Sequence, residues 1–416
     1  MLDPKFVAEN LKEIKEVAAE RGMKVDVSEL EKFSDARSQL RVQVERLRAE
    51  QNRLSKRGRK KKPTKKDIER ATEIKQELKN LEPQLKNIEE QIQHLLWQLP
   101  NLIHPKTPRG GVEKNKVLKK GKPKTLPFKA KNHEELSQNL DLIDFEAGSN
   151  VAGAKFYYLK NEAALLEFAL IKYAFDLLMD EGFTPFVTPD LAKSEIIDGV
   201  GFVPRGPESN IYMVEEEDLG LIGTAEITLG GYHADQVLKA EDLPLKYAGF
   251  SHCFRREAGT YGQESKGLYR VHQFSKVEMF VFCRPEESEK MHDYLLKLEE
   301  KIFKGLKIPY RVVDIASGDL GAAAYRKFDL EAWMPGRGEW GEITSTSNTT
   351  DYQARRLNVK YKRKDGATDY LHTLNGTAIA ISRALIAILE NYQQEDGSVK
   401  VPTALVPYVG KKIIRR

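Results

Sequence analysis

Apolar residues recur three and four positions apart through two long stretches of the first hundred residues. The first series consists of Leu30, Phe33, Arg37, Leu40, Val44, Leu47, Gln51 and Leu54. The second consists of Ala71, Ile74, Leu78, Leu81, Leu85, Ile88, Ile92, Leu95 and Leu99. Sustained alternation of these spacings between charged positions is typical of a coiled coil. A short segment containing Gly and Pro joins the two stretches, which predicts an antiparallel helical hairpin with arms about 45 Å long.

Pro83 conflicts with this pattern. It falls inside the second predicted helix but away from the apolar seam. Because proline lacks the backbone N–H and its ring crowds the preceding turn, we expect a kink at this position.

The pattern changes after Pro100. Residues 101–130 are rich in Pro, Gly and Lys and predict a linker. From about residue 131, helical and strand-like segments alternate irregularly. Residues 161–181 predict an amphipathic helix with Asn161 as its N-cap. Residues 376–393 predict a helix rich in small residues.

Four segments predict strands bounded by turn residues: FTPFVTPDL, KYAGFSHCFRRE, HQFSKVEMFVFC and KFDLEAWMP. They follow one another through loops and hairpins without regular crossover helices, which favours a mainly antiparallel sheet flanked by helices. The predicted fold class is therefore α+β. The predicted division is a helical domain at 1–104, a basic linker at 105–130 and an α+β domain at 131–416.

Composition excludes several classes of protein. The chain has 416 residues, of which 40% are apolar and 31% charged, as in ordinary globular proteins. Its longest uncharged run, Gln91–Pro105, is too short and too interrupted to span a membrane. The N-terminus carries early acidic residues and no apolar core of a signal peptide. Cys253 and Cys283 lack the spacing of a zinc or disulfide scaffold, so we expect no zinc and a reduced, cytoplasmic location.

The excess positive charge of the chain is concentrated near the hairpin turn. The net charge is +5, and the first hundred residues, with 23 basic and 18 acidic side chains, account for all of it. The turn, residues 53–66, has nine cations and no acid: Arg53, Lys56, Arg57, Arg59, Lys60, Lys61, Lys62, Lys65 and Lys66. A heptad pair alone favours a dimerisation coiled coil with a solvated turn. A self-repelling turn favours an anionic partner, and an RNA backbone recognised by shape fits best.

The first cluster of candidate chemistry lies between Phe254 and Phe280. Arg255 and Glu257 are predicted on one face of a strand, and Arg270, His272, Phe274, Lys276 and Glu278 on one face of the returning strand. Arginines clamp phosphate oxygens and an aromatic ring stacks on a base, so the set suits a nucleotide. A cross-strand ladder of salt bridges on a solvated sheet is an equal alternative.

Two further clusters are weaker when each is taken alone. Glu342 and Ser345 offer hard oxygen ligands that suit Mg²⁺, although this spacing is common on surfaces. Arg383 is a lone cation on an otherwise apolar helix, where a snorkelling arginine is the simpler interpretation. Neither GxGxxG nor GxxxxGK[ST] occurs in the chain.

Taken together and in order, these clusters resemble the class II aminoacyl-tRNA synthetases, and within them the seryl-tRNA synthetase family, over essentially the whole chain. FRRE with Arg270 resembles motif 2, the helix carrying Arg383 resembles motif 3, and TPFVTPDL around Pro189 resembles motif 1, which places Pro189 at a dimer interface. More specific are the stretches GTAEI, KFDLEAWMP, EITSTSN with DYQARR, LNGT and VPTALVPYVG. The basic hairpin is typical of this family among class II enzymes.

The resemblance implies roles for residues around ATP. Arg255 would bridge the α-phosphate and the substrate carboxylate, and Arg270 and Arg383 would hold the outer phosphates. Phe274 would stack on adenine. The remaining implied ATP contacts are Arg256, Glu257, Val271, Glu342, Ile343, Thr344 and Ser345, with Glu342 and Ser345 also binding Mg²⁺.

The resemblance also implies a serine pocket. The implied serine-binding residues are Thr224, Ala225, Glu226, Arg255, Glu278, Asn375 and Thr377, and the implied catalytic residues are Arg255, Glu278 and Arg383. A site built around a substrate hydroxyl rejects alanine strongly, by roughly 10⁴-fold in favourable cases. Four positions depart from common family residues: Thr346, Thr377, Ala378 and Ser382.

The implied activity is serine activation by ATP, followed by transfer to the 3′ end of tRNA(Ser), and of tRNA(Sec) where present, by a cytoplasmic homodimer without membrane contact. The 258–269 loop would lie near the acceptor stem. Two alternatives remain: a relative that loads a carrier protein, and an RNA-binding paralogue with an inactive site. The basic hairpin argues against the first, and the complete set of charged residues argues against the second.

Overall fold

The structure is a computed structural model that describes the chain except for residues 24, 26, 61, 203–209 and 258–266. The described chain forms two compact units, Met1–Leu102 and Ile103–Arg416. Lys61 and most of the 258–269 loop fall outside the described residues, and the predictions made for them remain predictions.

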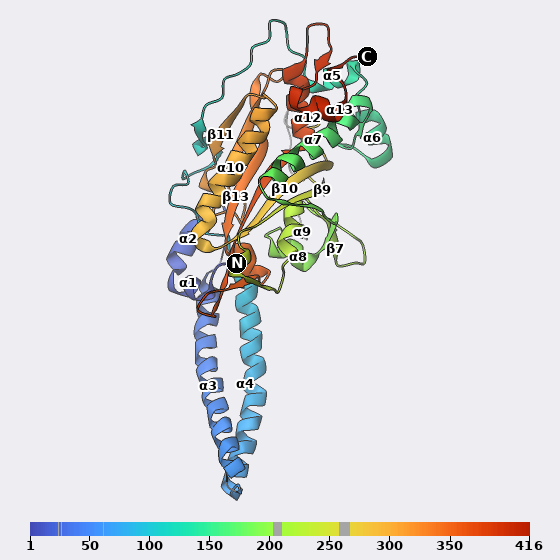
Figure 1. Cartoon of the computed structure of the whole chain (residues 1–416). Helices are drawn as coiled ribbons and strands as arrows, with labels where there is room; N and C mark the ends of the chain where they lie inside the picture. The colour runs from blue at the N-terminus through green and yellow to red at the C-terminus, as the bar shows by residue number, and fades with distance from the viewer. Residues whose placement is uncertain (24, 26, 61, 203–209, 258–266) are drawn as a thin grey trace. The chain divides into compact units, whose positions relative to one another are not determined.

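The N-terminal unit is helical, as the heptad pattern predicts. Its helices are α1 (Pro4–Glu9), α2 (Leu11–Glu20), α3 (Ser28–Lys60) and α4 (Lys65–Gln98). The two long helices lie side by side as an antiparallel hairpin (Figure 1). The seam buries Val44, Leu47, Ile74 and Leu78 against one another, which confirms the coiled-coil register.

Charged pairs across the two long helices flank this seam. Arg37 contacts Glu89 at 3.1 Å, and Arg48 contacts Glu82 at 2.7 Å. Such exposed pairs contribute little stability, but opposite charges at these positions favour one register of the two helices. The turn is closed by a capping box at the start of α4, in which Thr64 and Asp67 satisfy each other's backbone N–H groups.

Helix α4 includes Pro83 and continues through it from Lys65 to Gln98. The proline removes one backbone hydrogen bond, and Pro83 is flanked by Glu82, which pairs with Arg48 across the hairpin. Packing against α3 therefore holds a helix that local propensity disfavours at this point.

The second unit is built around an eight-stranded sheet, and the α+β prediction is confirmed. Across the sheet the strands are β1 (Lys116–Lys119), β11 (Tyr310–Asp314), β12 (Arg326–Met334), β13 (Glu339–Thr350), β16 (His372–Ala380), β10 (Gln273–Cys283), β9 (Leu245–Phe254) and β4 (Thr184–Val187). Neighbouring strands are antiparallel except β4, which pairs with β9 in parallel.

Three helices pack against the sheet: α7 (Asn161–Asp180), α10 (Ser288–Gly305) and α12 (Ile381–Tyr392) (Figure 1). They bury apolar faces with one side of the central strands in the main core. Strand β10 shows how the period of two divides the interior. Val277, Met279 and Val281 enter the main core, whereas Phe280 and Phe282 enter a second core.

The second core contains the short helix α9 (Ala225–Gly231). Because alternate residues of a strand share a face, Lys276 and Glu278 lie on the same side of β10 as Phe280 and therefore toward α9. This alternation brings Glu278 close to Glu226, which lies in the first turn of α9.

The remaining elements are short. The helices are α5 (His133–Asn139), α6 (Phe145–Ala152), α8 (Ser194–Gly199), α11 (Tyr352–Arg356) and α13 (Val406–Val409). The strands are β2 (Ile143–Asp144), β3 (Tyr158–Leu159), β5 (Leu191–Lys193), β6 (Tyr212–Met213), β7 (Leu219–Leu221), β8 (Val237–Lys239), β14 (Lys360–Lys362), β15 (Thr368–Tyr370), β17 (Val399–Lys400) and β18 (Ile413–Ile414). No helix in the described parts of the chain is both long and apolar enough to cross a membrane.

The structure corrects the sequence interpretation at two element boundaries. Residues 376–380 end strand β16, and the helix that was predicted from 376 begins only at Ile381. Small apolar residues fit either period, so the pattern could not separate a buried strand from a helix. Asn161 is not the N-cap of α7, because Lys160 occupies that position. The side chain of Asn161 instead donates to the backbone oxygen of Asp141.

Part of the segment read as a linker joins the sheet. Residues Lys116–Lys119 form strand β1 and pair with β11 at the sheet edge. Three of these four residues are exposed, so no apolar alternation was present to predict the strand.

Candidate active site

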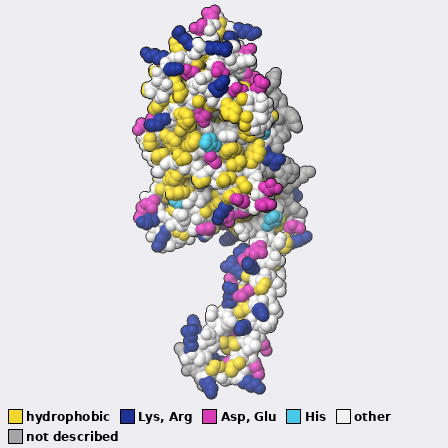
Figure 2. Space-filling view, turned by 90° about the vertical axis from the view of Figure 1, so that its right-hand side faces the viewer, with side chains coloured by type: hydrophobic (Ala, Val, Ile, Leu, Met, Phe, Trp, Pro, Cys, Tyr) yellow, Lys and Arg dark blue, Asp and Glu magenta, His cyan; other side chains and the backbone are white. Residues whose placement is uncertain are grey.

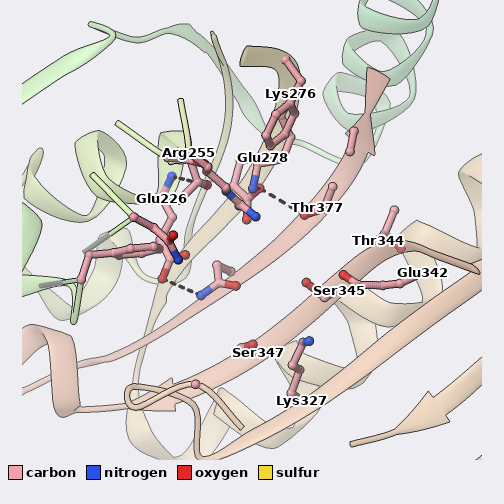
Figure 3. A pocket seen from close by; sticks show the side chains of 18 of the residues that line it. Glu226, Arg255, Lys276, Glu278, Lys327, Glu342, Thr344, Ser345, Ser347 and Thr377 are labelled. Carbon is pink, nitrogen blue, oxygen red and sulfur yellow. Dashed lines mark hydrogen bonds and ion pairs between the residues drawn. The ribbon is translucent and has the colours of Figure 1, made fainter. Parts of the chain in front are cut away.

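A cavity of about 470 Å³ opens on the sheet of the second unit. Residues of β10, β12, β13 and β16 line it, together with Arg255 after β9 (Figure 3). The start of α12 contributes Ser382 and Arg383. The predicted site residues on its wall are Thr224, Glu226, Arg255, Glu257, Arg270, Val271, Phe274, Glu278, Glu342, Ile343, Thr344, Ser345, Asn375, Thr377 and Arg383. Residues separated by up to 159 positions, from Thr224 to Arg383, therefore converge on one space.

Four residues of the predicted clusters and motifs, Ala225, Arg256, His272 and Pro189, are not on the cavity wall. Ala225 is buried in the second core, and the backbone N–H of Arg256 donates to the backbone oxygen of Asn210. The ring of His272 packs against Phe156. Pro189, predicted at a dimer interface, is exposed just after β4.

The β9–β10 hairpin places the first group of charges. Phe254 pairs with Gln273, so β9 ends one residue before Arg255. The predicted strand alternation at Arg255 and Glu257 is therefore wrong, and Glu257 adopts a positive φ of 47°. The chain turns at this point, and Arg255 and Glu257 reach the cavity from beyond the last paired residue.

Each member of this group has a neighbour that holds it in place. The guanidinium of Arg255 lies 5.3 Å from the centroid of the Phe274 ring, and its Nε donates to the backbone oxygen of Gly223. Arg270 contacts Glu257 at 3.2 Å. A planar cation beside an aromatic ring offers a surface for a base and a clamp for phosphate oxygens.

The far wall of the cavity carries a partly buried ion pair, with the Arg383 side chain 19% and the Glu342 side chain 36% exposed. Arg383, at the start of α12, contacts the Glu342 carboxylate on β13 at 3.0 Å and lies 5.0 Å from the Tyr269 ring centroid. Burial alone would raise the pKa of Glu342, but the positive charges of Arg383, Lys327 and Arg255 outweigh it and lower that pKa to about 2. The carboxyl group of Glu342 is therefore ionised throughout the neutral range.

The oxygen atoms of Glu342 and Ser345 could form part of a binding site for a divalent cation. A β-bulge at this point lets Glu342 pair with Glu331 and Ser345 with Asp329, and both Glu342 and Ser345 line the cavity. Among the described residues no group of three or more His, Cys, Asp or Glu side chains is arranged to hold a metal ion. Two protein oxygens suit Mg²⁺, which is commonly completed by substrate phosphates and water.

Lys327 extends this wall along β12, and Asp329 lies two residues further on the same strand. Their cross-strand partners are Ser347 and Ser345, so the four side chains share one face. Lys327 contacts the Asp329 carboxylate at 3.0 Å and lines the cavity. Burial raises the pKa of Asp329 to about 7, although Lys327 opposes the shift.

The opposite end of the cavity is rich in carboxylates. Glu278 is buried, contacts the ammonium of Lys276, and accepts from the hydroxyl of Thr377 at 3.4 Å. Glu226 accepts from Asn375 at 2.8 Å (Figure 3). Burial, followed by the charge of Glu278, raises the pKa of Glu226 to about 7. This end suits a ligand with an ammonium and a hydroxyl group.

Comparisons with known proteins agree over the whole length. The N-terminal family model, "Seryl-tRNA synthetase N-terminal domain", matches residues 1–103. The model "tRNA synthetase class II core domain (G, H, P, S and T)" matches residues 212–392. The serine–tRNA ligase of Dictyoglomus turgidum is 57% identical over 422 aligned positions, covering 100% of this chain and 99% of that protein. The chain belongs to the seryl-tRNA synthetase family.

Solved structures support the same assignment. Seryl-tRNA synthetase from Pyrococcus horikoshii, complexed with ATP, matches with a TM-score of 0.90 and 40% identity, covering 100% of this chain and 99% of that chain. The cytoplasmic serine–tRNA ligase of Naegleria fowleri, in complex with AMP, matches with a TM-score of 0.86, 33% identity and the same coverage of each chain. The chain is therefore a class II aminoacyl-tRNA synthetase.

The positions that depart from common seryl-tRNA synthetase residues have clear structural settings. Ala378 is the extra residue of a bulge in β16 and is fully buried. Ser382 lines the cavity beside Arg383. Thr346 is buried, and its hydroxyl donates to the backbone oxygen of Asn375 at 2.8 Å.

Sequence reasoning assigned no site role to several residues that the fold places at this synthetase cavity. Lys276 was placed on the correct face of its strand but was given no function. Lys327 and Tyr269 line the wall near Glu342 and Arg383. Gln353 lies behind Glu226 and contacts it directly. Only the strand alternation of KFDLEAWMP could have indicated Lys327, and nothing in the local sequence marks Gln353.

Proposed function

We propose that this member of the seryl-tRNA synthetase family activates L-serine with ATP and transfers the seryl group to the 3′ end of tRNA(Ser). One observation carries the proposal: three arginines and an ionised glutamate converge on a cavity whose other end holds two carboxylates, the buried Glu278 and the partly buried Glu226. The arginines match a triphosphate, and the carboxylates match the ammonium and hydroxyl groups of serine.

In the first step a carboxylate oxygen of serine attacks the α-phosphorus of ATP. The bond from that phosphorus to the bridging oxygen breaks, pyrophosphate leaves, and seryl-adenylate forms. Arg255 is proposed to contact both the α-phosphate and the serine carboxylate, where negative charge grows. No covalent intermediate with the protein is required, so the protein acts by positioning and by neutralising charge.

The rest of the ATP molecule has matching partners. Phe274, already beside the Arg255 guanidinium, is proposed to stack on adenine, and Glu257 to accept from the adenine amino group. Arg270 and Arg383 are proposed to hold the outer phosphates. Because Arg270 contacts Glu257 and Arg383 contacts Glu342, both contacts must rearrange when phosphates enter. Val271, Ile343 and Thr344 line the same part of the wall.

Magnesium is part of the same proposal. Glu342 and Ser345 would hold the ion, which supplies charge neutralisation to the phosphates. The lowered pKa of Glu342 means that this ligand needs no deprotonation at neutral pH. Its partner Arg383 would exchange the carboxylate for a phosphate oxygen.

Serine would be recognised by groups that are already oriented. Glu226 is proposed to bind the ammonium group, and Glu278 with Thr377 the hydroxyl group. Asn375 would close the pocket, and Thr224 would contribute from the N-cap of α9. Alanine lacks the hydroxyl group and cannot make the hydrogen bonds that Glu278 and Thr377 would form with serine, which is the basis for rejecting it.

The helical hairpin is proposed to bind tRNA. Its tip carries the exposed cations Arg53, Lys56, Arg57, Arg59, Lys62, Lys65 and Lys66, with the side chain of Arg57 67% exposed. Such charges neutralise phosphates without reading bases. The proposal includes tRNA(Sec) only where an organism supplies one.

A homodimer is also proposed, because apolar side chains gather on one face of the second unit (Figure 2). Phe168 on α7 is 70% exposed, and Val187 on the edge strand β4 is 81% exposed. Pro189 follows that strand. An unpaired edge strand beside large exposed apolar side chains suits a second copy of the chain.

Light scattering can test the dimer with Phe168→Asp and Val187→Asp together. A monomer is the expected result, and an unchanged mass would overturn this interface.

A cytoplasmic location belongs to the proposal as well, since both Cys253 and Cys283 are free and buried.

Pyrophosphate exchange into ATP tests the activity directly. Exchange should depend on serine and be at least about 10³-fold slower with alanine, since an unpaired buried polar site discriminates strongly. Threonine should also react more slowly, since the proposal requires the serine pocket to exclude the extra methyl group by volume. Serine-dependent exchange without transfer to tRNA(Ser) would instead indicate a different acceptor.

A further inference from the structure

The Glu226 side chain, proposed above to bind the serine ammonium, accepts a hydrogen bond from the buried side-chain amide of Gln353. No role has been assigned to this amide so far. Gln353 lies on α11 and is fully buried. Its Nε2 donates to Glu226 Oε1 at 2.7 Å and to the backbone oxygen of Val200 at 2.9 Å. One side chain therefore joins a functional carboxylate to the segment Val200–Phe202, which also lines the cavity.

The other end of the amide is held equally well. Gln353 Oε1 accepts from the hydroxyl of Thr373 at 2.8 Å, and the hydroxyl of Thr349 lies 3.3 Å away. Thr373 and Thr349 contact each other at 2.6 Å between their hydroxyl oxygens. The reverse orientation of the amide would point its oxygen at two acceptors. The network therefore fixes one orientation, with both N–H groups directed at Glu226 and Val200.

This arrangement determines which oxygen of Glu226 is used. Gln353 and Asn375 both donate to Oε1, at 2.7 and 2.8 Å. Two neutral donors on one oxygen orient the carboxylate and stabilise its ionised form. The other charges near Glu226 are Glu278 and Lys276 on β10 and Arg255 after β9.

We propose that Gln353 is a positioning residue of the serine pocket, which orients Glu226 through Oε1 so that Oε2 receives the substrate ammonium. The proposal rests on the assignment of Glu226 given above. Gln353 contacts neither substrate in this scheme, since it lies outside the cavity wall and acts through Glu226 and Val200. It sets the affinity for serine and leaves the ATP end of the cavity unchanged.

Gln353→Met tests the proposal, because methionine has similar volume but no hydrogen-bonding amide. Loss of a hydrogen bond to a charged group predicts a fall in kcat/KM for serine on the order of tenfold to a hundredfold. KM for ATP should stay within about twofold of the wild type. The matched control is Gln393→Met: this glutamine is also buried and bonded, to Lys131 and Glu390, but does not line or support the cavity.

A pH profile separates positioning from general loss of structure. The hydrogen bond from Gln353 opposes the burial that raises the pKa of Glu226. Its removal should raise that pKa further and move the acidic limb of kcat/KM for serine to higher pH. Gln353→Glu, which adds a carboxyl group beside Glu226, should move the limb further in the same direction. A structural defect alone would lower the profile without moving it.

Thr373→Val provides a milder test if Gln353 variants fold poorly. It removes the donor to Gln353 Oε1 without touching Glu226, so a smaller rise in KM for serine is expected. An unchanged KM for serine and an unmoved acidic limb in Gln353→Met would overturn the proposal. Glu226→Gln distinguishes failure of the role proposed for Gln353 from failure of the role proposed for Glu226. If this substitution leaves KM for serine unchanged, the assignment of Glu226 itself fails.

Discussion

The hairpin tip and the cavity both gather cations, but they hold them in opposite ways. At the tip, nine Lys or Arg side chains fall within residues 53–66 without a single acid. In the cavity, each arginine has an aromatic or acidic neighbour, as Arg383 has in Glu342 at 3.0 Å. The exposed cations of the tip attract a partner together, through an electrostatic field that salt screens. Each charge in the cavity acts on a ligand only when its position matches that of the ligand group.

This difference predicts how each region responds to substitution. A single change at the tip removes one of many similar contacts, so its effect should be small and should depend on salt. A single change in the cavity leaves a partly buried neighbour without the group that it contacts, so its effect should be large and depend little on salt. The following experiments test that contrast.

Arg255→Ala should have the largest effect. Losing one stabilising donor at the reacting phosphate predicts a fall in serine-dependent pyrophosphate exchange of about 10²- to 10³-fold. Arg311→Ala is the control, because Arg311 pairs with Glu331 and stacks on Trp340 away from the cavity. A loss below about tenfold in Arg255→Ala would contradict its assignment to the α-phosphate.

Glu342→Gln should come next. The concentration of Mg²⁺ that gives half-maximal exchange should rise by about tenfold to a hundredfold, because a charged ligand is replaced by a neutral one. The same titration on Glu339→Gln serves as control, since Glu339 lies on the same strand but pairs with Arg337 at the surface. An identical Mg²⁺ requirement in both variants would rule out Glu342 as the ligand.

Replacing the seven described tip cations by Gln should mainly affect tRNA. KM for tRNA(Ser) should rise by roughly tenfold or more and its salt dependence should become shallower, while pyrophosphate exchange stays unchanged. Neutralising Lys79 and Lys86, which lie further along α4 from the tip, gives a comparison. Equal loss of exchange and aminoacylation would refute the division of labour between the two units.

The acidic limb of serine use should reflect Glu226. Since its pKa is raised to about 7 and the ionised form binds the ammonium, kcat/KM for serine should fall as pH decreases through 7. Between pH 8 and pH 6 the expected decrease is about tenfold. Initial rates at low serine measure it, and in Glu226→Gln this limb should disappear. An acidic limb with its midpoint near pH 4.5 would show that burial does not raise the pKa of Glu226.

Pro83→Ala should have the smallest effect on activity. Alanine restores a backbone donor and relieves crowding in α4, so the N-terminal unit should become more stable by about 1–3 kcal/mol. Chemical denaturation followed by helical circular dichroism measures this change. Both exchange and aminoacylation should match the wild type, whereas a loss of aminoacylation would show that the proline shapes the arm for its partner.

Much of the molecule could be predicted from the order of its residues. The heptad spacing alone specifies α3 and α4, because a coiled-coil seam is a local, repeating property. The period of two in HQFSKVEMFVFC places Lys276 and Glu278 on one side of β10. Most implied site residues line the cavity, including Arg255, Arg270 and Arg383.

The local sequence pattern could not identify the secondary structure where the residues fit the helical period and the strand period equally well. Small apolar residues at 376–380 satisfy both a helix and a buried strand, and only pairing with β10 decides for the strand. The exposed strand β1 had no alternation to reveal it. Strand β9 ends just before Arg255, so the orientation of Arg255 and Glu257 depends on a turn and not on strand alternation.

The sequence by itself determined the helical hairpin, the charge of its tip and the set of charged residues that the catalytic chemistry needs. Only the tertiary structure decided which of them meet, because β9, β10, β13, β16 and α12 come together from distant parts of the chain. Contacts such as Gln353 with Glu226 join residues 127 positions apart. The shifted pKa of Glu226 likewise arises from burial, which no local pattern specifies.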